Sequence, residues 1–359
     1  MIERGTGDLL GADVEALVNT VNTEGVMGKG IALQFKRAFP DNFKAYKRAC
    51  DRNEVRPGHM FVFDQGGLAG GPRYLINFPT KRHWKSNSRL EDIQAGLADL
   101  VRVIEERKIR SVAVPPLGCG NGGLRWTEVE LLITSALGSL RDVRVVVFSP
   151  AGAPPPDQMR VGTERPNLTL GRAALLGLME KYGEPGTTFT KLELQKLAYF
   201  LQQAGEPLRL EFIPHLYGPY AERLNQVLEL LEGHYLRGFG DRNGPSEIVP
   251  DPGGLEDARR LLASQPATQA RLDRVARLFH GLESPHGAEL LATVHWVATA
   301  NPSTAEDLAK VTAAVHQWSD QKKRKFPSHH VEIAWERLHT EGWLRSTAIT
   351  NGGESPRVS

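Results

Sequence analysis

The chain has 359 residues, 40% of them hydrophobic, and a net charge of +2 at pH 7. This length suits two domains of roughly 150 to 200 residues better than one large core. Its two cysteines are too few for a disulfide framework, and no apolar run approaches the roughly 18 residues of a membrane-spanning helix. We therefore expect a globular protein of the reducing cytoplasm, without a membrane partner.

The first 150 residues alternate between short β-branched runs and helical patterns. The expected strands are residues 16–19, 60–63, 74–78, 112–114 and 143–148, and the expected helices are 90–108 and 127–140. This alternation predicts an α/β layered sheet. Lys and Arg outnumber Asp and Glu here by 21 to 17, which permits an anionic ligand or nucleic acid without requiring either.

A proline-rich stretch, SPAGAPPPDQ at 149–158, can continue neither a strand nor a helix. We place the end of the first domain at residue 150 and a linker at 151–168. From 169 to 345 the hydrophobic period is helical almost throughout, and Thr190 with Glu193 forms a capping box. The expected helices are 169–182, 191–205, 220–232, 254–264, 269–281, 286–299, 303–317 and 328–341. Residues 346–359 are expected to be disordered.

Two glycine-rich loops follow expected strands. The first, GVMGKG at 25–30, lacks the Ser or Thr that a nucleoside-triphosphate loop places after its lysine, and its glycine spacing differs from the dinucleotide fingerprint. What remains is a set of backbone amides and a helix N-terminus offered to an anion. The second, PPLGCGNGGLRW at 115–126, repeats this arrangement. Two such loops can clamp a diphosphate, and the alternative is a pair of independent tight turns.

Four separated motifs together resemble the macrodomain family, whose members bind ADP-ribose. They are GDLL from Gly7, LVNTVN from Leu17, GVMGKGIA from Gly25 and PPLGCGNGG from Pro115. The resemblance covers residues 1 to about 150. The expected fold is therefore an α/β macrodomain, a mixed sheet sandwiched between helices, followed by a mainly α-helical second domain.

The resemblance implies a ligand contact for individual residues. Asp8 would accept a hydrogen bond from the adenine amino group beside Leu9, and Phe148 would pack on the adenine ring. Asn22 would orient the distal ribose near its anomeric carbon, while Asn19 would hold the loop in place. The diphosphate would lie along Gly28, Lys29, Gly30, Ile31, Leu117, Gly118, Cys119, Gly120, Asn121 and Gly122. The simpler alternatives are a strand end at Asp8, a core residue at Phe148 and an Asx turn at Asn22.

The stretch INFPTKRHWKSNS at 76–88 bears on catalysis. It resembles the macrodomain branch that uses a lysine at the distal ribose, the terminal ADP-ribose hydrolases and most closely the DarG family of DNA ADP-ribosyl glycohydrolases. In this resemblance Lys81 is the catalytic lysine, and His83 and Trp84 form the substrate rim. The alternative is a solvated basic loop.

The mechanism implied for Lys81 is attack on the anomeric carbon of the distal ribose, with a thymine base of single-stranded DNA as the leaving group. Alternatively, Lys81 only stabilises the charge that develops on the leaving base. Attack requires a lowered pKa, which partial burial or the neighbouring cations Arg82, His83 and Lys85 could supply.

One departure from this pattern concerns the partner of Lys81. Relatives that pair the lysine with an acid carry an aspartate after the second glycine loop, whereas this chain has Arg125. No paired carboxylates of the ordinary glycosidase kind stand out. The histidines are scattered, so we expect no metal site and no cofactor, with ADP-ribose as ligand and product.

The helical half resembles the helical antitoxin domains of bacterial toxin–antitoxin systems, in TKLELQKLAYFLQQAG and YGPYAERL. The resemblance implies a cognate DNA ADP-ribosyltransferase toxin as partner of residues 169–345. The acids proposed to occupy the DNA-binding groove of the toxin are Glu222, Glu229, Glu232 and Asp241. The basic run 322–325 could instead contact nucleic acid, although such a run is usually a solvated turn.

Together these features predict an antitoxin that removes ADP-ribose from thymidine in single-stranded DNA and separately neutralises its toxin. Two alternatives use the same pocket. One is a non-catalytic ADP-ribose reader, and the other is a hydrolase of protein-linked or acetylated ADP-ribose.

Overall fold

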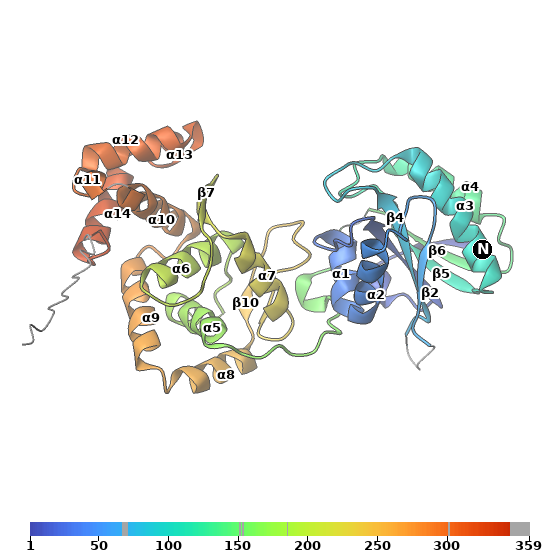
Figure 1. The fold of residues 1–359 in the computed structure, drawn as a ribbon, viewed down its shortest axis with the longest axis horizontal. Coiled ribbons are helices and arrows are strands. Elements are labelled where there is room, and N and C mark those ends of the chain that lie inside the picture. Colours follow the sequence, from blue (N-terminus) through green and yellow to red (C-terminus); the bar gives the residue numbers. More distant parts are fainter. Residues whose placement is uncertain (67–70, 151, 153, 185, 301, 345–359) are drawn as a thin grey trace, which may run out of the picture. The chain divides into compact units, whose positions relative to one another are not determined.

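The computed structural model describes residues 1–66, 71–150, 152, 154–184, 186–300 and 302–344. The chain forms two compact units (Figure 1). The first contains Met1–Arg165 together with Gly238–Pro245, and the second contains Pro166–Arg237 and the chain from Ser246 onward. The tail expected at 346–359 lies outside the described residues, as do positions 151 and 153 of the expected linker.

The first unit is built on a six-stranded mixed sheet with the strand order β1-β6-β5-β2-β4-β3. All neighbouring strands are parallel except β3, which is antiparallel to β4. The strands are β1 (Ile2–Gly5), β2 (Ala16–Asn22), β3 (Phe61–Asp64), β4 (Tyr74–Lys81), β5 (Ser111–Val114) and β6 (Arg144–Phe148). Because five strands run in one direction, the loops after all of them meet at one edge of the sheet.

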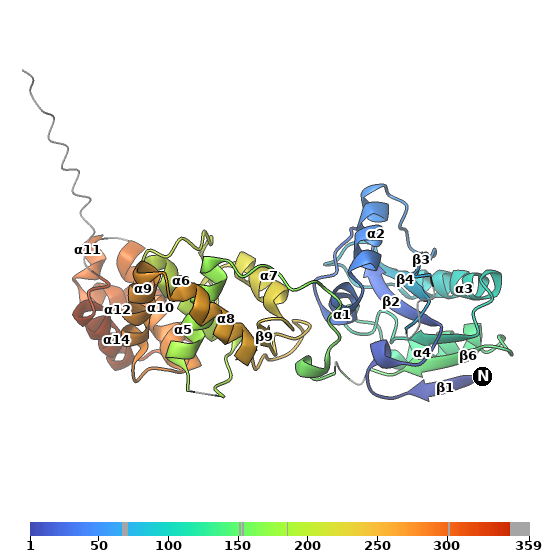
Figure 2. The same cartoon turned by 90° about the horizontal axis from the view of Figure 1, so that it is seen from below.

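Two pairs of helices cover the two faces of this sheet (Figures 1 and 2). They are α1 (Gly30–Ala38) with α2 (Pro40–Asp51), and α3 (Leu90–Glu106) with α4 (Trp126–Leu137). Successive side chains of a strand point to opposite faces, so Val18 belongs to the core under α3 and α4 while Leu17 belongs to the core beside α1. The predicted sandwich of sheet and helices is therefore confirmed.

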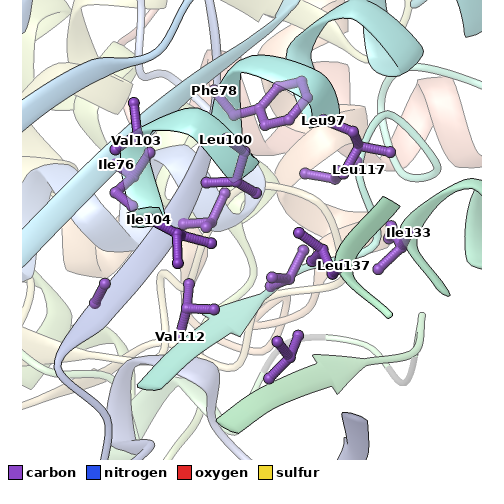
Figure 3. Packing of buried hydrophobic residues seen from close by; sticks show 14 of the residues in the cluster. Ile76, Phe78, Leu97, Leu100, Val103, Ile104, Val112, Leu117, Ile133 and Leu137 are labelled. Carbon is purple, nitrogen blue, oxygen red and sulfur yellow. The ribbon is translucent and has the colours of Figure 1, made fainter. Parts of the chain in front are cut away.

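The core under α3 and α4 is closely packed (Figure 3). Ile76 and Phe78 of β4 lie against Leu97 and Leu100 of α3, and all four are at most 1% exposed. A Cβ on Gly96 would lie 2.3 Å from the ring of Phe78, so only glycine allows the helix to come this close to the sheet. This contact sets how closely α3 packs on β4, and the carboxyl end of β4 carries Lys81.

Some elements of the first unit differ from the expected ones. The strand β1 was not predicted, because the charged residues Glu3 and Arg4 of this edge strand are exposed and leave no hydrophobic pattern. The strand β2 reaches Asn22 rather than ending at residue 19, and β4 reaches Lys81 rather than residue 78. Both proposed catalytic residues are thus strand residues.

The second unit is mainly helical, as predicted. Its helices are α5 (Leu170–Tyr182), α6 (Lys191–Gln203), α7 (Glu222–Leu231), α8 (Pro252–Leu262), α9 (Pro266–Phe279), α10 (Pro285–Ala300), α11 (Pro302–Ala305), α12 (Leu308–Trp318), α13 (Asp320–Lys325) and α14 (Ser328–Thr340). The capping box of Thr190 and Glu193 begins α6. The one helix expected at 303–317 is instead α11 and α12, because Asp307 caps a new helix by accepting from the Lys310 amide.

Two small antiparallel sheets interrupt the helices of the second unit. They pair β7 (Ile213–His215) with β8 (Gly218–Tyr220), and β9 (Leu236–Arg237) with β10 (Val249–Pro250). Short strands of two or three residues carry too few positions to produce a readable period. Across the described residues, no helix combines the length and the apolar character needed to cross a membrane.

Candidate active site

The first glycine loop connects β2 to the N-terminus of α1. Gly30, the first residue of α1, has φ +60, in the left-handed region that favours glycine. Lys29 precedes it in an extended conformation, and its side chain forms no cap hydrogen bond. The first-turn amides and the positive end of the helix dipole are suited to an anion.

The second glycine loop follows β5 and packs on the loop that follows β4. Gly118 has φ +70, and a Cβ on Gly122 would lie 2.3 Å from both the Gly118 oxygen and Ser88 Oγ. The Ser88 amide donates to the Gly122 carbonyl at 3.0 Å, which joins the two loops. Burial raises the pKa of Cys119 to about 11, so this thiol stays protonated at neutral pH. Ser88 was not singled out by sequence because its role depends on a loop about thirty residues away.

Lys81 ends β4 directly opposite Asn22 of β2. The register pairs Val21 with Pro79 but Asn22 with Lys81, so Thr80 is an extra residue in β4. Because side chains alternate along a strand, this bulge turns Lys81 to the face on which Asn22 lies. Lys81 Nζ donates a hydrogen bond to the backbone oxygen of Asn121 in the second glycine loop.

The pKa of Lys81 is lowered, and the cause is partial burial of its ammonium. The expectation that neighbouring cations could lower the pKa of Lys81 is not supported by the geometry. Arg82 is paired with Asp92 at 2.9 Å, and His83 lies 3.5 Å from Glu24. Among the described residues, no carboxylate lies within ion-pair distance of Lys81, and Arg125 pairs instead with Glu128.

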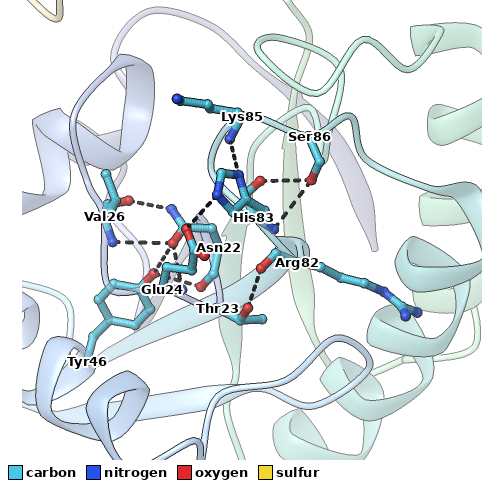
Figure 4. A network of polar contacts seen from close by, with 9 residues as sticks. All are labelled: Asn22, Thr23, Glu24, Val26, Tyr46, Arg82, His83, Lys85 and Ser86. Atoms are coloured by element: carbon cyan, nitrogen blue, oxygen red, sulfur yellow. Dashed lines mark hydrogen bonds and ion pairs between the residues drawn. The ribbon is translucent and has the colours of Figure 1, made fainter.

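The side chain of Asn22 organises the loop that follows it (Figure 4). Its Oδ1 accepts from the amide of Glu24 at 2.9 Å and from that of Val26 at 3.3 Å, and its Nδ2 donates to the Val26 oxygen. This is the Asx-turn arrangement that was the simpler alternative. The contact of Asn22 with a ribose stays a prediction.

Tyr46 of α2 holds Asn22 from the buried side. Its hydroxyl donates to the Asn22 backbone oxygen at 2.7 Å and lies 3.3 Å from Asn22 Oδ1 (Figure 4). Burial raises the pKa of Tyr46, so the hydroxyl remains a donor throughout the physiological range. Tyr46 was not predicted as a site residue, because nothing local to α2 indicates that it reaches β2.

Asn19 is fully buried and supports the first glycine loop. Its Nδ2 donates to Asn77 Oδ1 at 3.0 Å and lies 3.9 Å from the sulfur of Met27, and Asn77 in turn bonds Asn42. This chain of amides links β2 and β4 to α2. The supporting role expected for Asn19 fits these contacts.

The residues assigned to adenine lie near the opposite edge of the sheet, where Asp8 and Leu9 follow β1 and Phe148 ends β6. Asp8 caps a short 3-10 helix (Leu9–Gly11) by accepting from the Leu10 amide at 3.0 Å. Leu9 and Phe148 are buried in the core beside α1, and a Cβ on Gly5 would lie 2.5 Å from the Phe148 ring. Their contact with adenine stays a prediction.

The expected substrate rim is exposed. His83 stacks on Trp84 with ring centroids 5.9 Å apart, and Lys85 Nζ lies 4.8 Å from the Trp84 ring centre. Trp84 is 48% exposed, which leaves much of its ring open to a partner such as a nucleobase. Within the described residues, no group of three or more His, Cys, Asp or Glu could hold a metal ion.

The sheet order brings the site residues into one row. Asp8 follows β1, Phe148 ends β6, the second glycine loop follows β5, Asn22 ends β2 and Lys81 ends β4. At about 4.8 Å between strands, the row from β6 to β4 spans about 14 Å. The glycine-loop amides lie between the two ends.

The chain is similar to proteins of named families. A Macro domain model matches residues 18–133. Over 339 residues the chain is 50% identical to the DNA ADP-ribosyl glycohydrolase of Thermus aquaticus, covering 94% of this chain and 93% of that protein. It is 45% identical over 356 residues to the protein of the same name from Mycobacterium tuberculosis, covering 94% and 99%. A DNA ADP-ribosyl transferase–DNA ADP-ribosyl glycohydrolase fusion protein of Thermosipho africanus is 33% identical over 165 residues, 42% of each chain.

Proposed function

The chain belongs to the DNA ADP-ribosyl glycohydrolase family, and we propose that it hydrolyses the bond that joins ADP-ribose to a base of DNA. The observation that carries this proposal is the row of site residues along the sheet edge. Adenine would lie at β1 and β6, the diphosphate at the glycine loops, and the distal ribose between Asn22 and Lys81. This is the order of these groups along ADP-ribose.

Lys81 is the proposed nucleophile. The lone pair of its neutral amine forms a bond to the anomeric carbon of the distal ribose as the carbon–base bond breaks. The base leaves with that electron pair and takes up a proton. Water then replaces Lys81 at the same carbon, so the net reaction is hydrolysis. The lowered pKa of Lys81 and its position opposite Asn22 support this role.

The substrate proposed is thymidine in single-stranded DNA that carries ADP-ribose. The exposed ring of Trp84, flanked by His83 and Lys85, is suited to stack on an unpaired base. The assay is release of ADP-ribose from a modified oligonucleotide, run in parallel with modified protein and acetylated ADP-ribose. Faster turnover of either alternative substrate would contradict the DNA assignment, and binding without turnover of any substrate would indicate a reader.

Substitutions of Lys81 separate the two mechanisms. Lys81→Ala should lower the rate of release at least about 100-fold, whereas Lys44→Ala, which removes one ammonium from an exposed position of α2, should change it little. Lys81→Arg keeps the positive charge but cannot supply a neutral amine. Retention of activity in Lys81→Arg would favour the electrostatic role, and full activity in Lys81→Ala would rule out both. Asn22→Ala should also lower release if Asn22 orients the sugar.

We further propose that the second unit binds and neutralises a DNA ADP-ribosyltransferase toxin. The fusion of both activities in the Thermosipho africanus protein supports such a partnership, as does the match to the glycohydrolases across both units. Glu222 is exposed and remains a candidate for an acid in the DNA groove of the toxin, whereas Asp241 is only 7% exposed. If the antitoxin and single-stranded DNA bind the toxin simultaneously, mimicry of DNA is wrong.

A further inference from the structure

The segment Gly238–Pro245 is part of the first unit and is anchored on α1. Arg37 donates to the Gly240 oxygen at 2.8 Å, and its guanidinium lies 5.9 Å from the ring centre of Phe239. Phe239 is only 1% exposed. Arg37 belongs to the last turn of α1, so these contacts tie the segment to this helix.

Inside the segment, a tight turn presents Asp241 and Asn243. Gly240 and Arg242 both have positive φ, +66 and +68, and Asp241 Oδ1 accepts from the Asn243 amide at 3.0 Å. A non-glycine residue in the left-handed region is uncommon, and an Asx turn of this kind stabilises it. The turn therefore has a defined shape rather than being a loose connection.

This turn accepts a hydrogen bond from one donor of each glycine loop. The Gly30 amide donates to the Asp241 backbone oxygen at 3.0 Å, and Gln34 Nε2 lies 3.4 Å from the Asp241 carboxylate. Asn121 Nδ2 donates to Asn243 Oδ1 at 3.2 Å. A Cβ on Gly30 would lie 2.9 Å from Asn243 Nδ2, so Asn243 stands directly over the glycine.

A diphosphate cannot share this position with the turn. The Gly30 amide has one hydrogen, which the Asp241 oxygen already accepts, and a carboxylate close to the helix N-terminus takes the place suited to a phosphate. The Asp241 carboxylate and a bound diphosphate would also repel each other if both lay at the glycine loops. ADP-ribose must therefore displace Asp241 and Asn243 before its diphosphate reaches the amides.

We propose that the segment Gly238–Pro245 competes with the diphosphate of ADP-ribose for the two glycine loops. In this proposal Asp241 and Asn243 set the affinity for ADP-ribose. This proposal rests on the proposed function, because it takes the glycine loops as the diphosphate site. Asn121 links the segment to catalysis, since its side chain bonds Asn243 while its backbone oxygen accepts from Lys81. With the turn in place, Lys81 is held on the second glycine loop.

The test compares ADP-ribose binding by full-length wild type and the double variant Asp241→Ala/Asn243→Ala, measured by calorimetry. The variant loses the bonds to Gln34 and Asn121 and the turn that shapes the segment, so the binding-competent state becomes more populated. The Kd for ADP-ribose should fall about tenfold. The single variant Asn243→Ala, at an exposed position, should show part of this effect.

The matched control is Asp142→Ala, which removes the same charge at an exposed position outside the site. A tenfold gain in the control would mean that the effect is only a change of net charge. If wild type binds ADP-ribose and the double variant binds it equally or more weakly, the proposal that the segment competes with ADP-ribose is wrong. The proposed function would be unaffected by that result. Failure of every variant to bind ADP-ribose would overturn both.

Hydrogen exchange provides a second, ligand-free measurement. In the absence of ADP-ribose the Gly30 amide of the wild type should exchange slowly because the Asp241 oxygen accepts from it, and the double variant should exchange it several times faster. Equal exchange rates in the two proteins would overturn the proposal independently of any binding assay.

Discussion

At Lys81, a single extra residue in a strand decides which chemistry is possible. Without the bulge at Thr80, Asn22 would pair with Thr80, and Lys81 would point to the opposite face of the sheet. With it, the amine lies beside Asn22 and reaches Asn121 of the second glycine loop. The backbone therefore delivers a half-buried amine to the sheet edge, and burial lowers its pKa without help from another charge.

The pH dependence of the reaction distinguishes the two roles of Lys81. Its folded-state pKa lies below the ordinary value of about 10.4. If the neutral amine attacks, the single-turnover rate on modified oligonucleotide rises as pH rises through this lowered pKa. If the ammonium only stabilises the leaving base, the rate falls over the same interval. Lys44→Ala, at an exposed position of α2, should keep the wild-type profile, and a rate independent of pH up to the lysine range would contradict both roles.

The sequence indicates which residues are candidates for contact with the ligand. It indicates much less clearly which other residues hold those candidates in position. Lys81 and Asn22 stand next to recognisable glycine and strand patterns, so local spacing suggests them. Tyr46 and Ser88 act on residues of other elements, and only the folded chain brings them there. The same holds for the pKa of Lys81, because burial depends on packing that the neighbouring cations in the sequence do not reveal.

Among the elements of the second unit, α13 differs most from its sequence-based interpretation. Its basic run resembles a solvated turn, yet Lys322 is 1% exposed and donates to Glu289 of α10 at 2.6 Å and to Thr293 at 3.0 Å. Lys325 donates to the other Glu289 oxygen at 2.7 Å. Burial alone would raise the pKa of Glu289, but the two lysine hydrogen bonds outweigh it and the pKa is lowered.

Replacement of Glu289 should therefore destabilise the second unit. Glu289→Gln leaves a buried lysine without a counter-charge, and the free energy of unfolding should fall by about 3 kcal/mol. The measurement is urea unfolding followed by circular dichroism, in which only the transition of the second unit should shift. Glu332→Gln, at an exposed position of α14, is the matched control and should change stability by less than about 0.5 kcal/mol. Equal effects in the two variants would contradict the network.

Elements whose hydrophobic pattern continues over several helical turns were predictable. Elements that depend on partners far away in the sequence were not. The helices α5, α6, α10 and α14 each bury apolar residues over two or more turns, and such a pattern can be recognised locally. The edge strand β1 depends on pairing with β6, more than 140 residues away in the chain. Gly238–Pro245 gives no regular period at all, and its place beside α1 follows only from the contacts of Asp241, Asn243 and Arg37.

On the scale of the whole molecule, one chain combines two compact units for which we propose two ways of opposing the same modification. Hydrolysis in the first unit removes ADP-ribose that is already on DNA. Binding by the second unit would stop a toxin from adding it. Lys81 lies in the first unit, so the second mechanism should not depend on it.

Full-length Lys81→Ala tests this separation directly. In wild type, less ADP-ribose on DNA can result from removal or from inhibition of the toxin, and the two cannot be told apart. In the variant, removal should be at least about 100-fold slower, so any remaining decrease in ADP-ribose transfer to an oligonucleotide measures inhibition. We expect Lys81→Ala at one equivalent to slow the transferase to within about twofold of the initial rate seen with wild type. If the transferase instead works at its uninhibited rate, neutralisation depends on hydrolysis, and the second unit has another role.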